Sequence, residues 1–410
     1  MSLFSRHHSE QRIGAIVEVG SGSVVTAIAV STPDQSHPEI VWARREFANL
    51  SHEIDAEHSI KSMLATIMDS VMLLESEGRR ALEAAYHGAR IDTFQVSISA
   101  PWSYTVSKVI SYDRDEPFTI TNDLIESLIT KANEQTLTLL AQNEFNQSAG
   151  LNIMTRATTA VMANGYPTAD PTGQKAVSLA LTQVSAIGQG LITSAVDDLR
   201  VKLFPRATLE RYSTMLVFYS LMREMYPTTT ECCLVDLTYE ATEIAIIRDG
   251  VLQYSTHTAI GLNTLVRNLA LRLDRPQADA ESLLKRIYNE DSLDSLSEQE
   301  RTAVTNLFGE YQNALESLFH ETGDSLSIPK VIFLHSSFVH ERYYDNIVAD
   351  AAKAATGSSH TVHTLTHDLM LEKYTGESKI KILQKNHDTA TLMACQFFHK
   401  QGSDQDFTQM

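Results

Sequence analysis

Short apolar runs separated by glycine and serine open the chain, and their spacing indicates β-strands. Ile13–Val19 and Val24–Val30 flank the turn Gly20-Ser21-Gly22-Ser23, and Glu39–Phe47 forms a third run. Because glycine permits a positive φ and a close backbone approach, this pattern predicts a tight hairpin that a third strand extends. Apolar residues then recur at helical spacing from Ile54 to about Glu77, which predicts a long amphipathic helix.

A second pattern, from about residue 100 to 195, mixes alternating strands with a helix and several turns. The helix opens at Asn122, where an acidic first turn suits the helix dipole. Turn residues gather at Asn164-Gly165-Tyr166-Pro167 and at Pro171-Thr172-Gly173. We therefore predict a small α+β unit inserted into the surrounding domain, with strands at Tyr104–Tyr112, Asn152–Met162 and Ala176–Ile187.

The second half of the chain repeats the order of elements found at its start. The runs Glu231–Leu237, Glu243–Arg248 and Val251–Thr258 are predicted strands, and Asp249-Gly250 is a strong hairpin signal. Helical patterns follow, and Pro329–Leu334 then has the composition of a buried parallel strand. Both halves begin with three strands and two turns before they become helical, which indicates an internal duplication at a separation of about 220 residues.

These patterns divide the chain into two lobes and an insert. The expected boundaries are a first lobe at 10–100, continued by 196–229 and by a C-terminal helix at about 385–401, an inserted subdomain at 101–195, a second lobe at 230–384, and a frayed polar tail at 402–410.

Composition and charge exclude several classes of protein. Hydrophobic residues make up 43% and charged residues 20%, as in an ordinary globular protein. The 33 Lys and Arg against 51 Asp and Glu give a net charge of −18, and no basic stripe is visible, so nucleic-acid binding is disfavoured. Cys232, Cys233 and Cys395 have neither a disulfide nor a zinc spacing. Neither a signal peptide nor a membrane span is visible, so we expect a cytoplasmic protein.

The two hairpin turns carry the candidate chemistry. The first places the Glu18 carboxylate beside small residues, and the second places Asp236, Glu240 and Thr242 around its turn. Small-residue turns offer N–H groups to phosphate oxygens, and a carboxylate can hold magnesium through water. Two facing turns could therefore hold the phosphates of a nucleotide between two lobes. Tyr239 and Glu240, however, occupy positions where a phosphate site needs glycine. The alternative interpretation is a Gly-Ser turn that serves only the geometry of the first hairpin, and a turn with a solvated acid in the second.

Three further features receive structural interpretations. His360, His363 and His367 lie on a segment that we expect to be extended, which would scatter the rings as surface histidines. The apolar helix at Ser213–Met222 is expected to pack between the lobes. Trp102 is expected to be a buried anchor at the start of the insert.

The paired hairpins resemble the phosphate loops of the actin-like ATPase superfamily, and the insert is similar to the extra subdomain of the FtsA and PilM families. Three segments favour PilM: the opening from Ile13 to Val24, Asp236-Leu-Thr-Tyr-Glu-Ala-Thr-Glu-Ile, and Ala259-Ile-Gly-Leu-Asn-Thr. The resemblance implies an α/β, two-lobed actin-like fold (ribonuclease H-like and duplicated) with an inserted small α+β subdomain.

The resemblance also implies a site for ATP and Mg²⁺. It implies no catalytic residue and at most a weak ATPase activity. Glu18 replaces the usual aspartate, Thr238 replaces a glycine, and Leu334-His-Ser-Ser-Phe stands where the family has a glycine-rich adenosine loop. Glu18 and Asp236 are the expected Mg²⁺ ligands through water. The expected nucleotide contacts are Glu18, Gly20, Ser21, Gly22, Ser23, Asp236, Thr238, Glu240, Thr242, Gly261, Asn263, Lys285, Ser336 and Ser337.

Three functions follow from the resemblance. The first is a scaffold of the type IV pilus inner-membrane complex, peripheral to the membrane, which binds the N-terminal cytoplasmic peptide of a PilN-like partner in a groove between the insert and the first lobe. Pilus motor ATPases and further copies of the chain are additional partners in that hypothesis. The second is an FtsA-like division protein, disfavoured because the tail after Gly402 is acidic and polar. The third is a metabolite kinase, which needs a catalytic acid or base beside a competent phosphate site.

Overall fold

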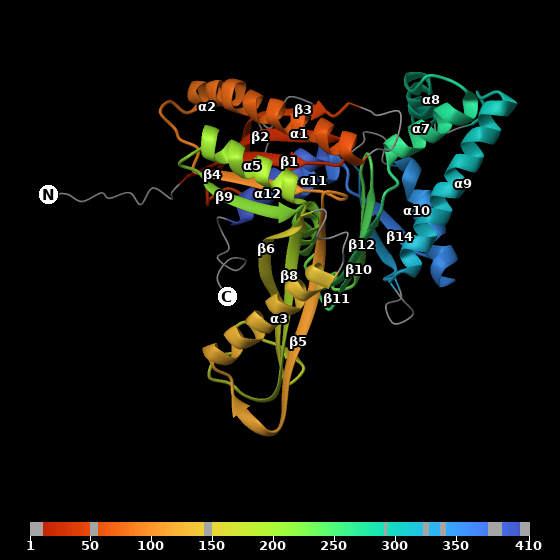
Figure 1. Cartoon of the computed structure of the whole chain (residues 1–410). Helices are drawn as coiled ribbons and strands as arrows, with labels where there is room; N and C mark the ends of the chain where they lie inside the picture. Colours follow the sequence, from red (N-terminus) through yellow and green to blue (C-terminus); the bar gives the residue numbers. More distant parts are fainter. Residues whose placement is uncertain are drawn as a thin grey trace.

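The computed structural model describes residues 11–49, 56–142, 150–290, 293–322, 328–336, 342–375 and 388–401. Within these ranges the chain forms three β-sheets, two of five strands and one of four, with helices packed around them (Figure 1). In this described part, no helix is both long enough and apolar enough to cross a membrane.

The first sheet has the strand order β3-β2-β1-β4-β9. β1 (Arg12–Val19), β2 (Ser23–Ser31) and β3 (Glu39–Phe47) are antiparallel neighbours, as the sequence predicts. β4 (Thr93–Ile98) and β9 (Thr208–Ser213) continue the sheet in parallel on the other side of β1. β9 is absent from the sequence prediction, and it forms the edge of this sheet.

The second sheet repeats the first in order and direction. Its order is β12-β11-β10-β13-β14, with antiparallel pairing on one side of β10 and parallel pairing on the other. The predicted internal duplication is therefore confirmed. The strands are β10 (Cys232–Leu237), β11 (Thr242–Arg248), β12 (Val251–Thr258), β13 (Val331–Ser336) and β14 (Thr361–Thr364).

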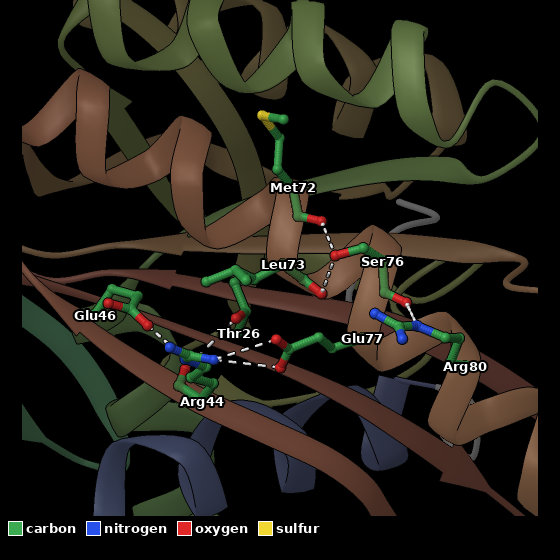
Figure 2. Close-up of polar contacts among 8 residues, drawn as sticks. All are labelled: Thr26, Arg44, Glu46, Met72, Leu73, Ser76, Glu77 and Arg80. Carbon is green, nitrogen blue, oxygen red and sulfur yellow. Dashed lines mark hydrogen bonds and ion pairs between the residues drawn. The ribbon is translucent and has the colours of Figure 1, made fainter.

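The helix predicted to end near Glu77 continues through a π-helical turn. α1 (Ala56–Leu73) passes into η1 (Leu74–Gly78) and then α2 (Arg79–Ala85). A Cβ at Gly78 would lie 3.1 Å from both Ile28 and Trp42, so glycine lets this turn approach the sheet closely. Figure 2 shows Arg44 of β3 between Glu46 and Glu77, whose carboxylates lie 2.5 and 3.2 Å from the guanidinium. The pair between Arg44 and Glu77 connects the π-helical turn to β3, whereas Arg44 and Glu46 both belong to β3.

Two helices fill the space between the first and second sheets. α6 (Thr214–Met225) and α12 (Thr389–Gln401) contribute Phe218, Met222 and Phe397 to a core that also contains Leu234 and Phe333 of the second sheet. The prediction that the apolar helix at Ser213–Met222 packs between the lobes is confirmed. α12 also covers β1 and β2, where a Cβ at Gly14 would lie 2.8 Å from the Phe398 ring.

The remaining helices belong to the two lobes. α5 (Gly190–Leu203) packs beside α1 on the first sheet. A separate apolar core joins the second sheet to the helices that flank it. The helices of the second lobe are α7 (Leu262–Leu273), α8 (Gln277–Glu290), α9 (Glu298–His320), α10 (Arg342–Thr356) and α11 (His367–Thr375).

The inserted unit is an antiparallel sheet covered by one helix, and Figure 1 shows it projecting away from the first sheet. Its strand order is β5-β8-β6-β7, and α3 packs on it through a small apolar core of its own. β5 also lies against β12, the edge strand of the second sheet. The elements are β5 (Ser103–Thr119), α3 (Asn122–Gln142), β6 (Asn152–Ala163), β7 (Tyr166–Pro167) and β8 (Lys175–Gly188).

Candidate functional site

The turns of the two hairpins face each other and touch. Ser21 Oγ donates a hydrogen bond to Thr238 Oγ1 at 2.8 Å and accepts one from the Glu240 N–H at 2.7 Å. A Cβ built on Gly22 would lie 2.6 Å from Tyr239 Cβ. The sequence hypothesis places these turns opposite each other, which is correct, but it expects a gap between them for phosphates, and here the turns are in direct contact.

Glu18 is buried at the end of β1, beside the first turn. Its side chain is 3% exposed, and Oε1 accepts a hydrogen bond from Ser99 Oγ at 3.1 Å. Among the described residues Oε2 is buried without a hydrogen-bond partner. Burial raises the pKa of Glu18 to about 7, although Arg45 acts in the opposite direction. The carboxyl group predicted to hold a metal is therefore a mixture of the protonated and ionised forms near pH 7.

Arg45 is a site residue that the sequence analysis does not identify. Its Nε lies 2.6 Å from Asp388 Oδ2, and its Nη1 donates to Ser23 Oγ. Burial lowers the pKa of Arg45, but the charge of Asp388, the hydrogen bond to it and the charges of Glu18 and Tyr239 together outweigh this effect and raise the pKa. Asp388 also accepts from the Thr391 N–H and hydroxyl group at the start of α12. Strand alternation places Arg44 and Arg45 on opposite faces of β3, and this was the available signal that one arginine is buried.

Asp236 is paired with a histidine. Its Oδ1 lies 2.8 Å from His335 Nδ1, and both side chains are 2% exposed. His335 Nε2 lies 3.1 Å from Thr389 Oγ1 of α12. The sequence analysis assigns His335 and Ser336 to an altered adenosine loop, but both belong to β13, in which His335 is the register partner of Asp236. The Ser336 carbonyl accepts from Thr389 Oγ1, and Ser337 lies outside the described residues.

Glu240 is not the solvated acid considered from the sequence. Both of its oxygens contact the Arg267 guanidinium, at 3.0 and 2.5 Å, and Oε1 also accepts from Asn263 Nδ2 at 2.8 Å. Gly261 lies beneath this group, where a Cβ would be 2.4 Å from the Thr238 carbonyl oxygen. The predicted residues Gly261 and Asn263 therefore lie at the second turn. There they contact other groups of the protein, Thr238 and Glu240.

Two other predicted residues have separate structural roles. Thr242 Oγ1 donates to the Ile260 carbonyl at 2.7 Å and lies 3.0 Å from the Tyr311 hydroxyl. Lys285 forms an ion pair with Glu281 at 2.6 Å on the surface of α8, with its side chain 58% exposed. Thr242 thus fixes the second hairpin, and Lys285 belongs to an exposed helix pair.

Trp102 and the three histidines complete the candidates. The Trp102 indole is buried and donates from Nε1 to the Gly20 carbonyl at 3.1 Å, so the buried-anchor interpretation is confirmed. His363 of β14 packs against the Phe333 ring with centroids 5.7 Å apart, and His367 lies 3.4 Å from Asp368. Across the described ranges, no group of three or more His, Cys, Asp or Glu side chains is arranged to hold a metal ion.

Comparisons with known proteins identify the fold. No protein-family model matches the sequence, and no curated protein matches it either. A solved structure described as the PilM–PilN type IV pilus biogenesis complex matches 97% of this chain and 99% of its own chain, with a TM-score of 0.57 at 10% identity. The chain has a PilM-like, actin-like fold. The predicted PilM-like architecture, with two duplicated lobes and an insert, is therefore confirmed at the level of the fold.

Two other solved structures match the PilM-like chain less well. The ethanolamine utilization protein EutJ from Carboxydothermus hydrogenoformans has a TM-score of 0.43 at 10% identity, covering 86% of this chain and 84% of its own. MreB 5 of Spiroplasma citri bound to AMPPNP has a TM-score of 0.40 at 9% identity, covering 87% and 92%.

The residues of this PilM-like chain do not fit the nucleotide that the resemblance implies. A phosphate chain needs open space and bare N–H groups between the turns. Here Tyr239 packs on Gly22, and the Glu240 N–H is already bonded to Ser21. The expected metal ligands Glu18 and Asp236 bond to Ser99 and His335. The donor set around the two turns therefore does not fit ATP with Mg²⁺.

Proposed function

We propose that the protein is a scaffold of a type IV pilus inner-membrane complex and binds the cytoplasmic N-terminal peptide of a single-pass, PilN-like membrane protein. The observation that carries this proposal is the match to the structure described as a PilM–PilN complex, which extends over 97% of the chain and therefore includes the insert. Localisation at the inner face of the membrane would then come through the partner.

The chemistry around the two turns favours binding over catalysis. Two of its acids are paired with groups of the protein itself, Asp236 with His335 and the part-buried Glu240 with Arg267. A kinase of this fold needs an acid or base that reaches a substrate beside a phosphate site. A scaffold needs only a stable platform with a peptide groove.

The edge of the first sheet offers a place for such a peptide. β9 is an edge strand, and the inserted β6 lies near it. The Thr208 N–H donates to Asp92 O on the β4 side, so alternation directs the backbone groups of Leu209 and Arg211 to the outer side. Thr155 of β6 donates to the Arg211 carbonyl there. An extended peptide between the insert and the first lobe would then pair with the outward backbone groups of Leu209, next to the Arg211 carbonyl that Thr155 already occupies.

The charge of the chain suits the same partner. The net charge of −18 attracts basic segments, which are common next to the cytoplasmic end of a membrane span. This attraction increases the association rate and its dependence on salt.

The experiment that tests the proposal begins with affinity capture of the tagged protein from its native cells in mild detergent, followed by mass spectrometry. We expect a single-pass membrane protein with a short cytoplasmic N-terminus, together with pilus motor ATPases. A tubulin-like division protein in its place would establish the FtsA-like alternative. Recovery of neither class would contradict the scaffold proposal.

A synthetic peptide of the captured N-terminus then tests the site by fluorescence anisotropy. Leu209→Pro removes an outward N–H without breaking the ladder to β4, so we expect affinity to fall at least about tenfold. Leu209→Val keeps that N–H and serves as the matched control. Equal affinities for the two variants would exclude β9 as the peptide site and leave the partner itself unaffected.

A further inference from the structure

At the two turns, protein groups bond to each other at the position where a phosphate-binding turn would bond to its ligand. A phosphate-binding turn presents its N–H groups to oxygen atoms of the ligand. Here Ser21 Oγ receives the Glu240 N–H and donates to Thr238 Oγ1, which in turn donates to the Ala241 carbonyl at 2.9 Å. Phe47 and Tyr239 add an edge-to-face ring contact, with centroids 5.8 Å apart. These contacts join the two turns directly, without an intervening group.

Arg45 provides a permanent positive charge beneath the first turn. Its guanidinium lies between the first turn, through Ser23, and the start of α12, through Asp388. Burial raises the pKa of Glu18, and the charge of Arg45 acts in the opposite direction. A nucleotide site of this kind meets the need for positive charge with a metal ion, whereas a guanidinium stays charged at every physiological pH.

Two residues at the start of α12 connect this charge to the other lobe. Asp388 bonds to Arg45 of the first sheet, and the next residue, Thr389, bonds to His335 of the second sheet. His335 in turn bonds to Asp236, the acid at the second turn. Polar contacts on both sides of the Asp388–Thr389 peptide bond therefore connect Ser23 in one lobe to Asp236 in the other.

We propose that this chain holds its two lobes closed by protein contacts alone, with the Arg45 guanidinium as an internal replacement for a bound nucleotide and its metal. Arg45 acts as a positioning residue, and it fixes the first turn and α12 relative to each other. The inference concerns the free protein and does not depend on the pilus partner.

The first test is a nucleotide titration of the wild-type chain. We expect millimolar ATP with Mg²⁺ to leave the melting temperature unchanged and to produce no heat in calorimetry, because a ligand that binds the folded state raises the apparent stability in proportion to its saturation. A saturable rise in melting temperature would overturn the proposal.

The second test measures the distance between the lobes. Met68→Cys on α1 and Leu271→Cys on α7 place spin labels at side chains that are 50% and 78% exposed, while all three native cysteines are buried. Double electron–electron resonance spectroscopy of the labelled chain should give one narrow distribution of distances between the two spin labels. Addition of Mg·ATP should leave this distribution unchanged. A second distribution that disappears on addition of Mg·ATP would contradict closure by protein contacts alone.

Neighbouring arginines of β3 provide a matched pair of variants. Arg45→Met keeps the apolar stem and removes the charge, so we expect the distance distribution to broaden or shift to longer distances. Arg44→Met removes an equal charge from an exposed pair with Glu46 and Glu77, and should leave the distribution unchanged. Equal behaviour of the two variants would remove Arg45 from the proposal. If Arg45→Met does not fold, the wild-type titration and distance measurement still decide whether closure needs nucleotide.

Discussion

The indole N–H of Trp102 donates to the carbonyl oxygen of Gly20 across 3.1 Å. Trp102 stands at the start of the inserted unit, and Gly20 begins the turn between β1 and β2. This hydrogen bond therefore attaches the insert to the turn that contacts the second lobe. Any movement of the insert on its partner would act on that turn first.

Replacing Trp102 by phenylalanine tests this connection. The ring still fills the buried site, but the hydrogen bond to Gly20 is lost, so we expect the free energy of unfolding to fall by about 1 kcal/mol. Trp102→Ala adds a cavity and should lower it by about 3–5 kcal/mol. Urea denaturation with intrinsic fluorescence and circular dichroism measures both. A Trp102→Phe variant as stable as the wild type would show that the hydrogen bond contributes nothing.

The contact between Gly22 and Tyr239 predicts that a destabilising substitution of Gly22 can be compensated by a substitution of Tyr239. Gly22→Ala places a Cβ against the Tyr239 Cβ, so the turns must separate, and we expect a loss of about 1–3 kcal/mol in the free energy of unfolding. Tyr239→Gly removes the opposing atom and should restore part of this loss in the double variant. Additive effects in a double-mutant cycle would contradict direct contact of the turns.

The ion pair of Glu240 with Arg267 should contribute far more than the exposed pair of Lys285 with Glu281. Glu240→Ala leaves a buried guanidinium without its charge partner, and we expect a loss of about 3–5 kcal/mol in the free energy of unfolding. Lys285→Ala removes an exposed helix pair and should change that free energy by at most about 0.5 kcal/mol. Thermal and chemical denaturation compare the two. A Glu240→Ala loss as small as that of Lys285→Ala would contradict the structure.

Glu243 makes stability depend on pH in a defined direction. Burial, with a contribution from Asp236 opposite it on β10, raises the pKa of Glu243 to about 8, and Ser255 donates to Oε1 at 2.9 Å in partial compensation. Because the folded state holds this proton more tightly than the unfolded state, its stabilising effect is full below about pH 4.5. It is lost as the pH rises toward 8.

Glu243→Gln keeps a neutral group in that place and removes the titration. We expect the variant to lose less stability than the wild type between pH 5 and 8, by a few kcal/mol in the free energy of unfolding. Glu18, with its own raised pKa, supplies a remaining slope. Parallel stability curves for the two proteins would exclude Glu243 as a source of the pH dependence.

The buried thiols should be unreactive until the chain unfolds. Cys232, Cys233 and Cys395 are buried, and burial raises the pKa of the Cys232 thiol to about 12 and the pKa values of the other two thiols as well. Because the thiolate is the reactive form, a chromogenic disulfide should modify none of them in the native protein and all three in denaturant. Rapid modification without denaturant would show that at least one thiol is accessible.

The sequence predicts the limits of a strand correctly where the alternation of apolar and polar residues and the flanking turn residues define them. β3 and β12 have the predicted limits, because alternation and turn residues define them without help from other elements. β9 has no such pattern, since Thr-Leu-Glu-Arg-Tyr-Ser is short and polar, and it becomes a strand only through parallel pairing with β4. Tertiary pairing of this kind cannot be obtained from local propensity.

The site residues also differ in whether local sequence or tertiary packing identifies them. Ser21, Asp236 and Glu240 are found from their residue types at turns, but their partners lie far away in the chain, as with Ser21 and Thr238, which are 217 positions apart. Arg45, His335 and Arg267 occupy strands and a helix whose patterns do not reveal which acid each one meets. The packing of the two lobes decides these pairs, and the sequence alone does not describe that packing.

α12 covers β1 and β2, although almost the whole chain separates these elements. During synthesis, the sheet face that carries Gly14 and Ile16 must therefore wait for residues near 394–398 to leave the ribosome before its apolar surface is covered. The first lobe is translated first and completed last. Until then, its exposed face is a natural target for chaperones, and nascent chains stalled before α12 should bind them more strongly than released protein.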